Sequence, residues 1–279
     1  AIFRPFFASE RARRKNRRVG SIFATTMHVS PRTLSLTQAI SGSAFGCFLL
    51  PHLANHWSFH LGLATNSRIL SLFRLGYQNR FVEPALFTSL GVHMGAGLLR
   101  VWQRVQNKDV DIKQVLQWVS KEIRLVLSLD VLALHKWSGY YLTLFTVAHA
   151  YFSRAPPLAH AESPIDSTYV TLTMQLWPYL FTPYYGLLAA AGSVHFVTGS
   201  TKASKILFPR ASLLRPVLRP PVTRRLALCF AALSVSSVLA MGGFYFGVHV
   251  ERWDEYVEVI RPHIPTVAWM IASPRPVPA

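Results

Sequence analysis

The chain has little of what many redox and metal proteins need. Only two of its 279 residues are cysteine, Cys47 and Cys229, and both fall inside apolar stretches. Neither a disulfide framework nor a cysteine-ligated metal or iron–sulfur site is therefore indicated. A glycine-rich dinucleotide fingerprint is also missing. These absences exclude an oxidoreductase that works alone through a bound dinucleotide or an iron–sulfur cluster.

Charged residues are scarce, and hydrophobic residues are abundant. They make up 15% and 51% of the chain, a balance typical of integral membrane proteins. Five apolar stretches reach the roughly 20 residues that a helix needs to cross a bilayer; they lie at 35–61, 84–104, 131–153, 169–200 and 225–250. Pro178 and Pro183 interrupt the fourth stretch, and Pro51 predicts a kink in the first. We expect an all-α integral membrane protein with five transmembrane helices.

The cations are distributed unevenly along the chain. A formal net charge of +17 would suggest a nucleic-acid partner in a soluble protein, but in a membrane protein the distribution of charge indicates orientation and no nucleic acid is expected. The basic N-terminal extension, 1–34, and the loop before the fifth stretch contain almost no acids, so they should share the positive side. The loop at 154–168 and the C-terminal tail, 251–279, are more acidic and fall on the opposite side.

The basic extension also resembles the remnant of a mitochondrial targeting region, since it contains arginine and serine with almost no acids. This predicts a multi-pass protein of the mitochondrial inner membrane with its N-terminus in the matrix. Contact with anionic lipids such as cardiolipin is expected for such a segment.

A short pattern occurs twice. His93 is followed by Gly97 and Arg100, and His195 is followed at the same spacing by Gly199 and Lys202. On a helix, the glycine lies one turn beyond the histidine and the cation two turns beyond it, on the same side.

The duplication extends upstream of each copy. Ser41-Gly42 precedes His52 by ten residues, and Ser138-Gly139 precedes His149 by the same distance. The chain therefore divides into a first helix pair at 35–104 and a second helix pair at 131–202. An amphipathic connection at 105–130 joins them, and a basic loop with the fifth helix follows at 203–250.

Histidines inside a bilayer are costly unless they are ligated, paired or facing a cavity. Four of them on facing helices of a bundle could hold haem b, one group or two. From their depth we pair His93 with His195 near the positive side, and His52 with His149 near the other. His56, one turn beyond His52, is an alternative ligand. The opposing interpretation is that each histidine only hydrogen-bonds a carbonyl of its neighbour.

The remaining parts of the two patterns suit the same cofactor. Arg100 and Lys202 could meet the haem propionates, and Gly97 and Gly199 could give the macrocycle clearance. Two imidazole ligands leave iron without an open coordination position, which suits electron transfer.

Residues His135 to Gly139, which read His-Lys-Trp-Ser-Gly, resemble the His-Arg-x-Ser-Gly motif of the cytochrome b membrane anchor of succinate dehydrogenase, respiratory complex II. The His-x-x-x-Gly patterns resemble that family's haem-ligand motif. Five spans with four ordered histidines also resemble the dihaem anchor of bacterial fumarate reductases, and the Ser-Gly pattern is similar to a fungal mitochondrial lipid-homeostasis adaptor family. The resemblance covers about 35–202.

The resemblance implies a haem-binding four-helix bundle that anchors soluble catalytic subunits, including a matrix-side iron–sulfur subunit, and passes electrons to ubiquinone. It further implies a quinone site at His135, Lys136, Trp137 and Ser138. No residue of this chain would be catalytic by itself.

Leu132 stands where the family has a quinone-binding serine, and Lys136 replaces its arginine. These departures favour the alternative, a non-catalytic adaptor or supernumerary scaffold subunit. A transporter is a third interpretation, but the repeat is parallel and buried carboxylates are few.

Overall fold

The computed structural model describes residues 29–106, 128–161, 164–210 and 219–265, with single positions between 120 and 126. This part of the chain is all-helical, with eight α-helices and two short 3-10 helices and no strand. The α-helices are α2 (Pro31–Trp57), α3 (Leu63–Tyr77), α4 (Val82–Gln106), α6 (Val131–His160), α7 (Thr168–Leu176), α8 (Pro178–Leu207), α9 (Pro220–Met241) and α10 (Trp253–Ile260).

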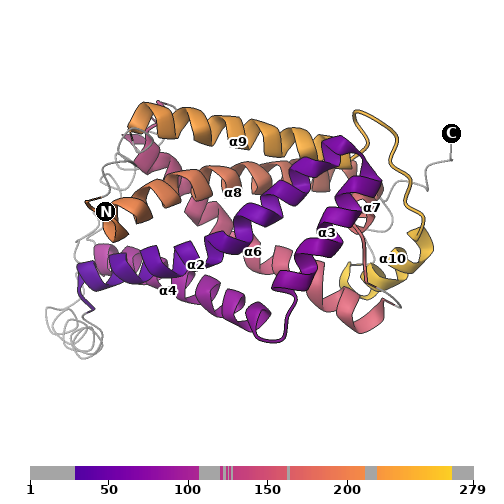
Figure 1. Ribbon diagram of the computed structural model, residues 1–279, viewed down its shortest axis with the longest axis horizontal. Helices are drawn as coiled ribbons and strands as arrows, with labels where there is room; N and C mark the ends of the chain where they lie inside the picture. Colours follow the sequence, from indigo (N-terminus) through magenta and orange to yellow (C-terminus); the bar gives the residue numbers. More distant parts are fainter. Residues whose placement is uncertain are drawn as a thin grey trace, which may run out of the picture.

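Four long helices, α2, α4, α6 and α8, run alternately up and down (Figure 1). Helix α2 packs against α4 and α8, and α8 packs in turn against α6 and α9. The starts of α2 and α6 therefore lie at the same end of the bundle as the ends of α4 and α8. Helices α3, α7 and α10 gather at the other end (Figure 1), which we call the capped end.

Two segments are long and apolar enough to cross a membrane, Pro31–Leu61 and Pro220–Met241, and both agree with predicted spans. Helices α4, α6 and α8 have 25, 30 and 30 residues, which exceeds the necessary length. Among the described residues they fall short in hydropathy alone, since they carry histidine, tyrosine and hydroxyl side chains. Five transmembrane helices therefore remain a prediction.

Polar residues lie among the apolar ones in the interior of the bundle, and large apolar residues lie on its outside. Small hydroxyl residues are buried between helices, including Ser41, Ser138, Ser193 and Ser234, while many large apolar side chains of α2, α4, α6 and α8 are exposed. These four hydroxyls have partners, and Ser193 and Ser234 share a hydrogen bond of 2.7 Å that joins α8 to α9. This distribution suits a surface covered by lipid better than one covered by water.

Several helix boundaries differ from those predicted. The break expected near Pro178 is confirmed, because α7 ends at Leu176 and α8 begins at Pro178. Pro51 and Pro183, by contrast, lie inside continuous helices. The fifth predicted span is wrong over 242–250, because α9 ends at Met241 and Gly243 adopts a positive φ of 86°.

Two helices were not predicted at all. Helix α3 lies between the first two predicted spans, 35–61 and 84–104, and it starts directly after Gly62, whose φ is 95°. Helix α10 lies in the C-terminal tail. The amphipathic piece expected at 110–129 lies mostly outside the described residues.

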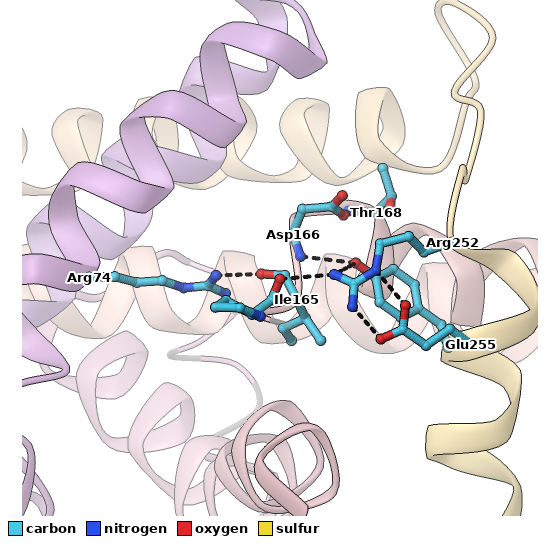
Figure 2. Close-up of polar contacts among 8 residues, drawn as sticks. Arg74, Ile165, Asp166, Thr168, Arg252 and Glu255 are labelled. Carbon is cyan, nitrogen blue, oxygen red and sulfur yellow. Dashed lines mark hydrogen bonds and ion pairs between the residues drawn. The ribbon is translucent and has the colours of Figure 1, made fainter. Parts of the chain in front are cut away.

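The capped end is held by one polar network (Figure 2). Arg74 of α3 donates to the carbonyl of Ile165, and Arg252 donates to Pro164 and to both carboxylate oxygens of Glu255. These bonds with Glu255 raise the pKa of Arg252. The loop before α7 is thus hydrogen-bonded to Arg74 of α3 and to Arg252, which precedes α10. Below it, a buried apolar cluster joins α7 to α10; its members are Tyr169, Leu172, Leu176, Trp177, Val250, Trp253, Tyr256, Val259 and Ile260.

Candidate functional site

One large cavity runs along the bundle between α2, α4, α6 and α8. Its volume is about 1360 Å³, above the roughly 300–1,000 Å³ of typical small-molecule pockets. All four predicted ligand histidines line it, as do both predicted propionate partners. The cavity therefore brings together residues that are up to 150 positions apart in the sequence (His52 and Lys202).

His93 and His195 face each other at one end, as their pattern predicts. Their ring centroids are 5.9 Å apart and their planes are nearly perpendicular, at 83°. Nδ1 of His93 lies 3.0 Å from the carbonyl oxygen of Gln38, and Nδ1 of His195 lies 3.2 Å from that of His135. A carbonyl can only accept, so each Nδ1 carries the proton and each Nε2 keeps its lone pair. We call these two residues the cationic-end pair, because Arg100, Arg104, Lys136 and Lys202 line the cavity at the same end.

The two Ser-Gly motifs have a role that the sequence did not reveal. A Cβ at Gly42 would lie 2.8 Å from Cε1 of His93, and a Cβ at Gly139 would lie 3.0 Å from Cε1 of His195. Each imidazole therefore rests on a glycine of the facing helix. The signal was present in the equal spacing of the two motifs, but nothing local in the sequence connects each glycine to its histidine.

The glycines of the His-x-x-x-Gly motifs face other side chains. A Cβ at Gly97 would lie 2.9 Å from Nε2 of Gln38, and a Cβ at Gly199 would lie 3.3 Å from Cε1 of His135. Their predicted role, clearance for a macrocycle, is untested. In this structure, the side chains of Gln38 and His135 occupy the space beside these two glycines. These two residues occupy equivalent places in the two halves, four positions before the Ser-Gly glycine.

The second predicted pair lies toward the capped end. The ring centroids of His52 and His149 are 6.3 Å apart, at an interplanar angle of 65°. Nε2 of His52 lies 3.2 Å from Nε2 of His56, so the two histidines are hydrogen-bonded to each other. His149 meets Tyr185 edge to face. We call His52 and His149 the capped-end pair.

Cations gather where the cavity reaches the end of α4 and α8. Arg100, Arg104 and Lys202 line it there together with Lys136, and Lys202 interacts electrostatically with the other three. Nη1 of Arg100 donates to Oε1 of Gln38 at 2.5 Å. We call this end of the bundle the cationic end; it is the predicted positive side.

The four residues predicted to bind quinone do not form one surface. His135 stacks on His195, with centroids 4.4 Å apart and planes at 14°, and Ser138 donates to the carbonyl of Leu134. Trp137 packs edge to face with Tyr140. His135 and Lys136 line the cavity, whereas Trp137 and Ser138 are not among the described residues that line it.

The residues of the cationic-end pair are of the kind that could hold a cofactor through two imidazoles. Among the described residues, no group of three or more histidine, cysteine or acidic side chains is arranged to hold a metal ion. Two imidazoles with protonated, carbonyl-bound Nδ1 atoms and lone pairs on Nε2 are the arrangement that haem ligation uses.

Comparison with protein-family models and with curated proteins found no match for this chain.

Proposed function

We propose that this chain is a haem b-binding membrane anchor of a mitochondrial respiratory assembly, similar to the anchor of complex II. It would hold soluble subunits at the inner membrane and pass electrons between a matrix-side iron–sulfur subunit and ubiquinone. The observation that supports this most is the cationic-end pair, whose Nδ1 atoms are bound to carbonyls of facing helices. Such outer bonds fix the ring and raise the basicity of the ligating nitrogen.

Four helices supply the residues for this role. His93 and His195 would hold one haem, and His52 and His149 would hold a second. Arg100 and Lys202 would pair with propionates at the cationic end, where charge-assisted bonds are strong. Bound in this way, haem b supplies one-electron transfer with no open coordination position. His135 and Lys136 line the cavity beside the cationic-end pair, which is where a quinone carbonyl would meet a donor.

A second function, a non-catalytic adaptor or scaffold with the same fold, is favoured by a different observation. Gln38 and His135 fill the space beside Gly97 and Gly199, and Leu132 stands where quinone anchors have serine. On this interpretation the histidine–carbonyl bonds serve only to join helices.

An absorption spectrum of the purified, folded protein separates the two functions. The anchor requires a reduced-minus-oxidised α-band of b type and a haem content of one or two per chain. A helical, thermally cooperative preparation that binds no haem after expression with a haem supply would contradict the anchor and support the scaffold.

A further inference from the structure

The cavity opens sideways between α4 and α6. These two helices pack mainly against other helices, α4 against α2 and α6 against α8. Several residues that line the cavity are themselves exposed, among them Phe87 and Leu98 on α4 and Tyr140 and Leu144 on α6. Leu144 is the most exposed of them, at 71%. The opening therefore has two apolar rims, and in a membrane it would face the lipid phase.

The two ends of this opening differ in charge. At the capped end, Arg154 of α6 and Glu83 of α4 form a bidentate ion pair, with distances of 2.5 and 2.7 Å, that ties the helices together. At the cationic end, Arg104 and Lys136 lie on the two helices that flank the opening. Among the described residues that line the cavity, the acids are Glu83 and Asp166, both at the capped end. The opening is thus neutralised at one end and strongly positive at the other.

We propose that the opening between α4 and α6 binds an anionic phospholipid. Its phosphate would lie against Arg104 and Lys136, which sit where helices end and where a lipid headgroup lies in a bilayer. One acyl chain would lie between the rims, along Leu98 and Leu144, and stop before the Glu83–Arg154 pair. Lysine and arginine bind phosphate through charge-assisted hydrogen bonds, and the apolar rims match a hydrocarbon chain but not a polar ligand.

This site shares Lys136 with the proposed quinone site but uses none of the residues proposed to hold haem. The lipid phosphate would use the outer cations, Arg104 and Lys136, whereas the proposed propionate partners are Arg100 and Lys202. Haem content is measured on every sample of the experiment below. Failure of lipid binding in a haem-loaded protein, or lipid binding in a haem-free one, then separates the two proposals.

The experiment uses the full chain in phosphatidylcholine vesicles that contain a small fraction of phosphatidic acid with a photoactivatable acyl chain. We expect cross-links on α4 and α6 near Leu98 and Leu144. The double variant Arg104→Gln, Lys136→Gln should lower this labelling about tenfold, the change that corresponds to about 1.4 kcal/mol of binding free energy. The matched control, Arg68→Gln with Arg80→Gln, removes two cations from the α3 region and should leave labelling unchanged.

A second variant keeps the charges and blocks the space. Leu144→Trp should also reduce labelling, and circular dichroism confirms that each variant is folded. Equal labelling by a photoactivatable phosphatidylcholine would overturn the proposal, as would labelling that the control lowers as much as the double variant. Full competition by an equal concentration of oleate would instead assign the site to a free fatty acid and reject a phospholipid.

Discussion

At the cationic end, His93 and His195 are each held by a backbone carbonyl of the facing helix, whereas at the capped end the bond that His52 makes within the described part of the chain is to another histidine. Nothing comparable holds His149 among the described residues, whose ring contacts are with His52 and Tyr185. A bond from Nδ1 to a carbonyl fixes both tautomer and ring orientation. The cationic-end pair is therefore preorganised for a ligand, and the capped-end pair is not.

The difference has a source in the two Ser-Gly motifs. At the cationic end, each imidazole fits onto the glycine of one motif and reaches the carbonyl one turn before it. No glycine lies under His52 or His149 in an equivalent way among the described residues, and a stack with Phe48, 5.2 Å away, supports His52 instead. The same duplicated pattern thus yields one rigid pair and one adaptable pair.

The largest expected effect comes from removing a ligand of the cationic-end pair. His93→Ala and His195→Ala should each abolish the haem at that end, because a single remaining imidazole cannot supply both axial bonds. Haem at the capped-end pair should be partly retained. Pyridine haemochrome assay and reduced-minus-oxidised spectra measure this directly.

His60→Ala is the matched control, because His60 is an exposed histidine at the far end of the same bundle. It should bind haem as the unaltered chain does. If His93→Ala and His195→Ala both kept full haem content, the pairing of these two residues would be wrong.

The next effect tests whether glycine at the Ser-Gly motif is what preorganises the rigid pair. Gly42→Ala puts a methyl group 2.8 Å from the ring of His93. Overpacking of this kind costs about 1–3 kcal/mol, against a gain of about 1 kcal/mol in helix propensity. We expect a lower thermal unfolding midpoint and reduced haem content.

Gly91→Ala gives the matching comparison on α4, because nothing lies within 4 Å of a Cβ placed there. That variant should be neutral or slightly more stable. Equal behaviour of the two alanine variants would show that the His93–Gly42 contact has no energetic importance.

A smaller effect, confined to one end of the cavity, distinguishes the two candidates of the capped-end pair. His52 and His56 lie one turn apart on α2 with their Nε2 atoms 3.2 Å apart, so they could not serve as axial ligands on the two opposite faces of one haem, and one would ligate while the other supports it. We expect His52→Ala to remove the second haem and His56→Ala to leave its spectrum in place. The reverse result would move the ligand assignment to His56 and keep the pair.

The sequence predicted much of this arrangement because the repeat is a local pattern. The equal spacing of His93–Gly97 and His195–Gly199 placed the two histidines on facing helices near the cations, and the structure has them there. The break at Pro178 was predictable for a similar reason, since proline acts through its own ring.

What the sequence could not predict depends on contacts between distant segments. Helix α3 is fastened by the bond from Arg74 to Ile165, 91 positions away, and α10 is buried against α7. Gln38 holds His93 through its backbone carbonyl, which every residue possesses, so no side-chain pattern could reveal that contact. His135, predicted to bind quinone, lies against His195 because it is the equivalent of Gln38 in the second half.

The smallest expected effect concerns the cations that distinguish the two ends. Arg100 is held by the side chain of Gln38, and Lys202 lies among three other cations. Adding an electron to a haem beside them is favoured by their positive charge, so Arg100→Gln or Lys202→Gln should lower the midpoint potential of the cationic-end haem. A loss on the order of 1 kcal/mol corresponds to about 40 mV for a one-electron couple.

Potentiometric titration of the b-type band measures this shift in midpoint potential, and the capped-end haem in the same sample is the internal reference. Arg68→Gln, which removes an exposed cation of α3, should leave the cationic-end potential unchanged. Unchanged potentials in both test variants would mean that Arg100 and Lys202 only anchor the helix ends at the membrane surface, and the charge difference between the two ends would then have no part in tuning the haems.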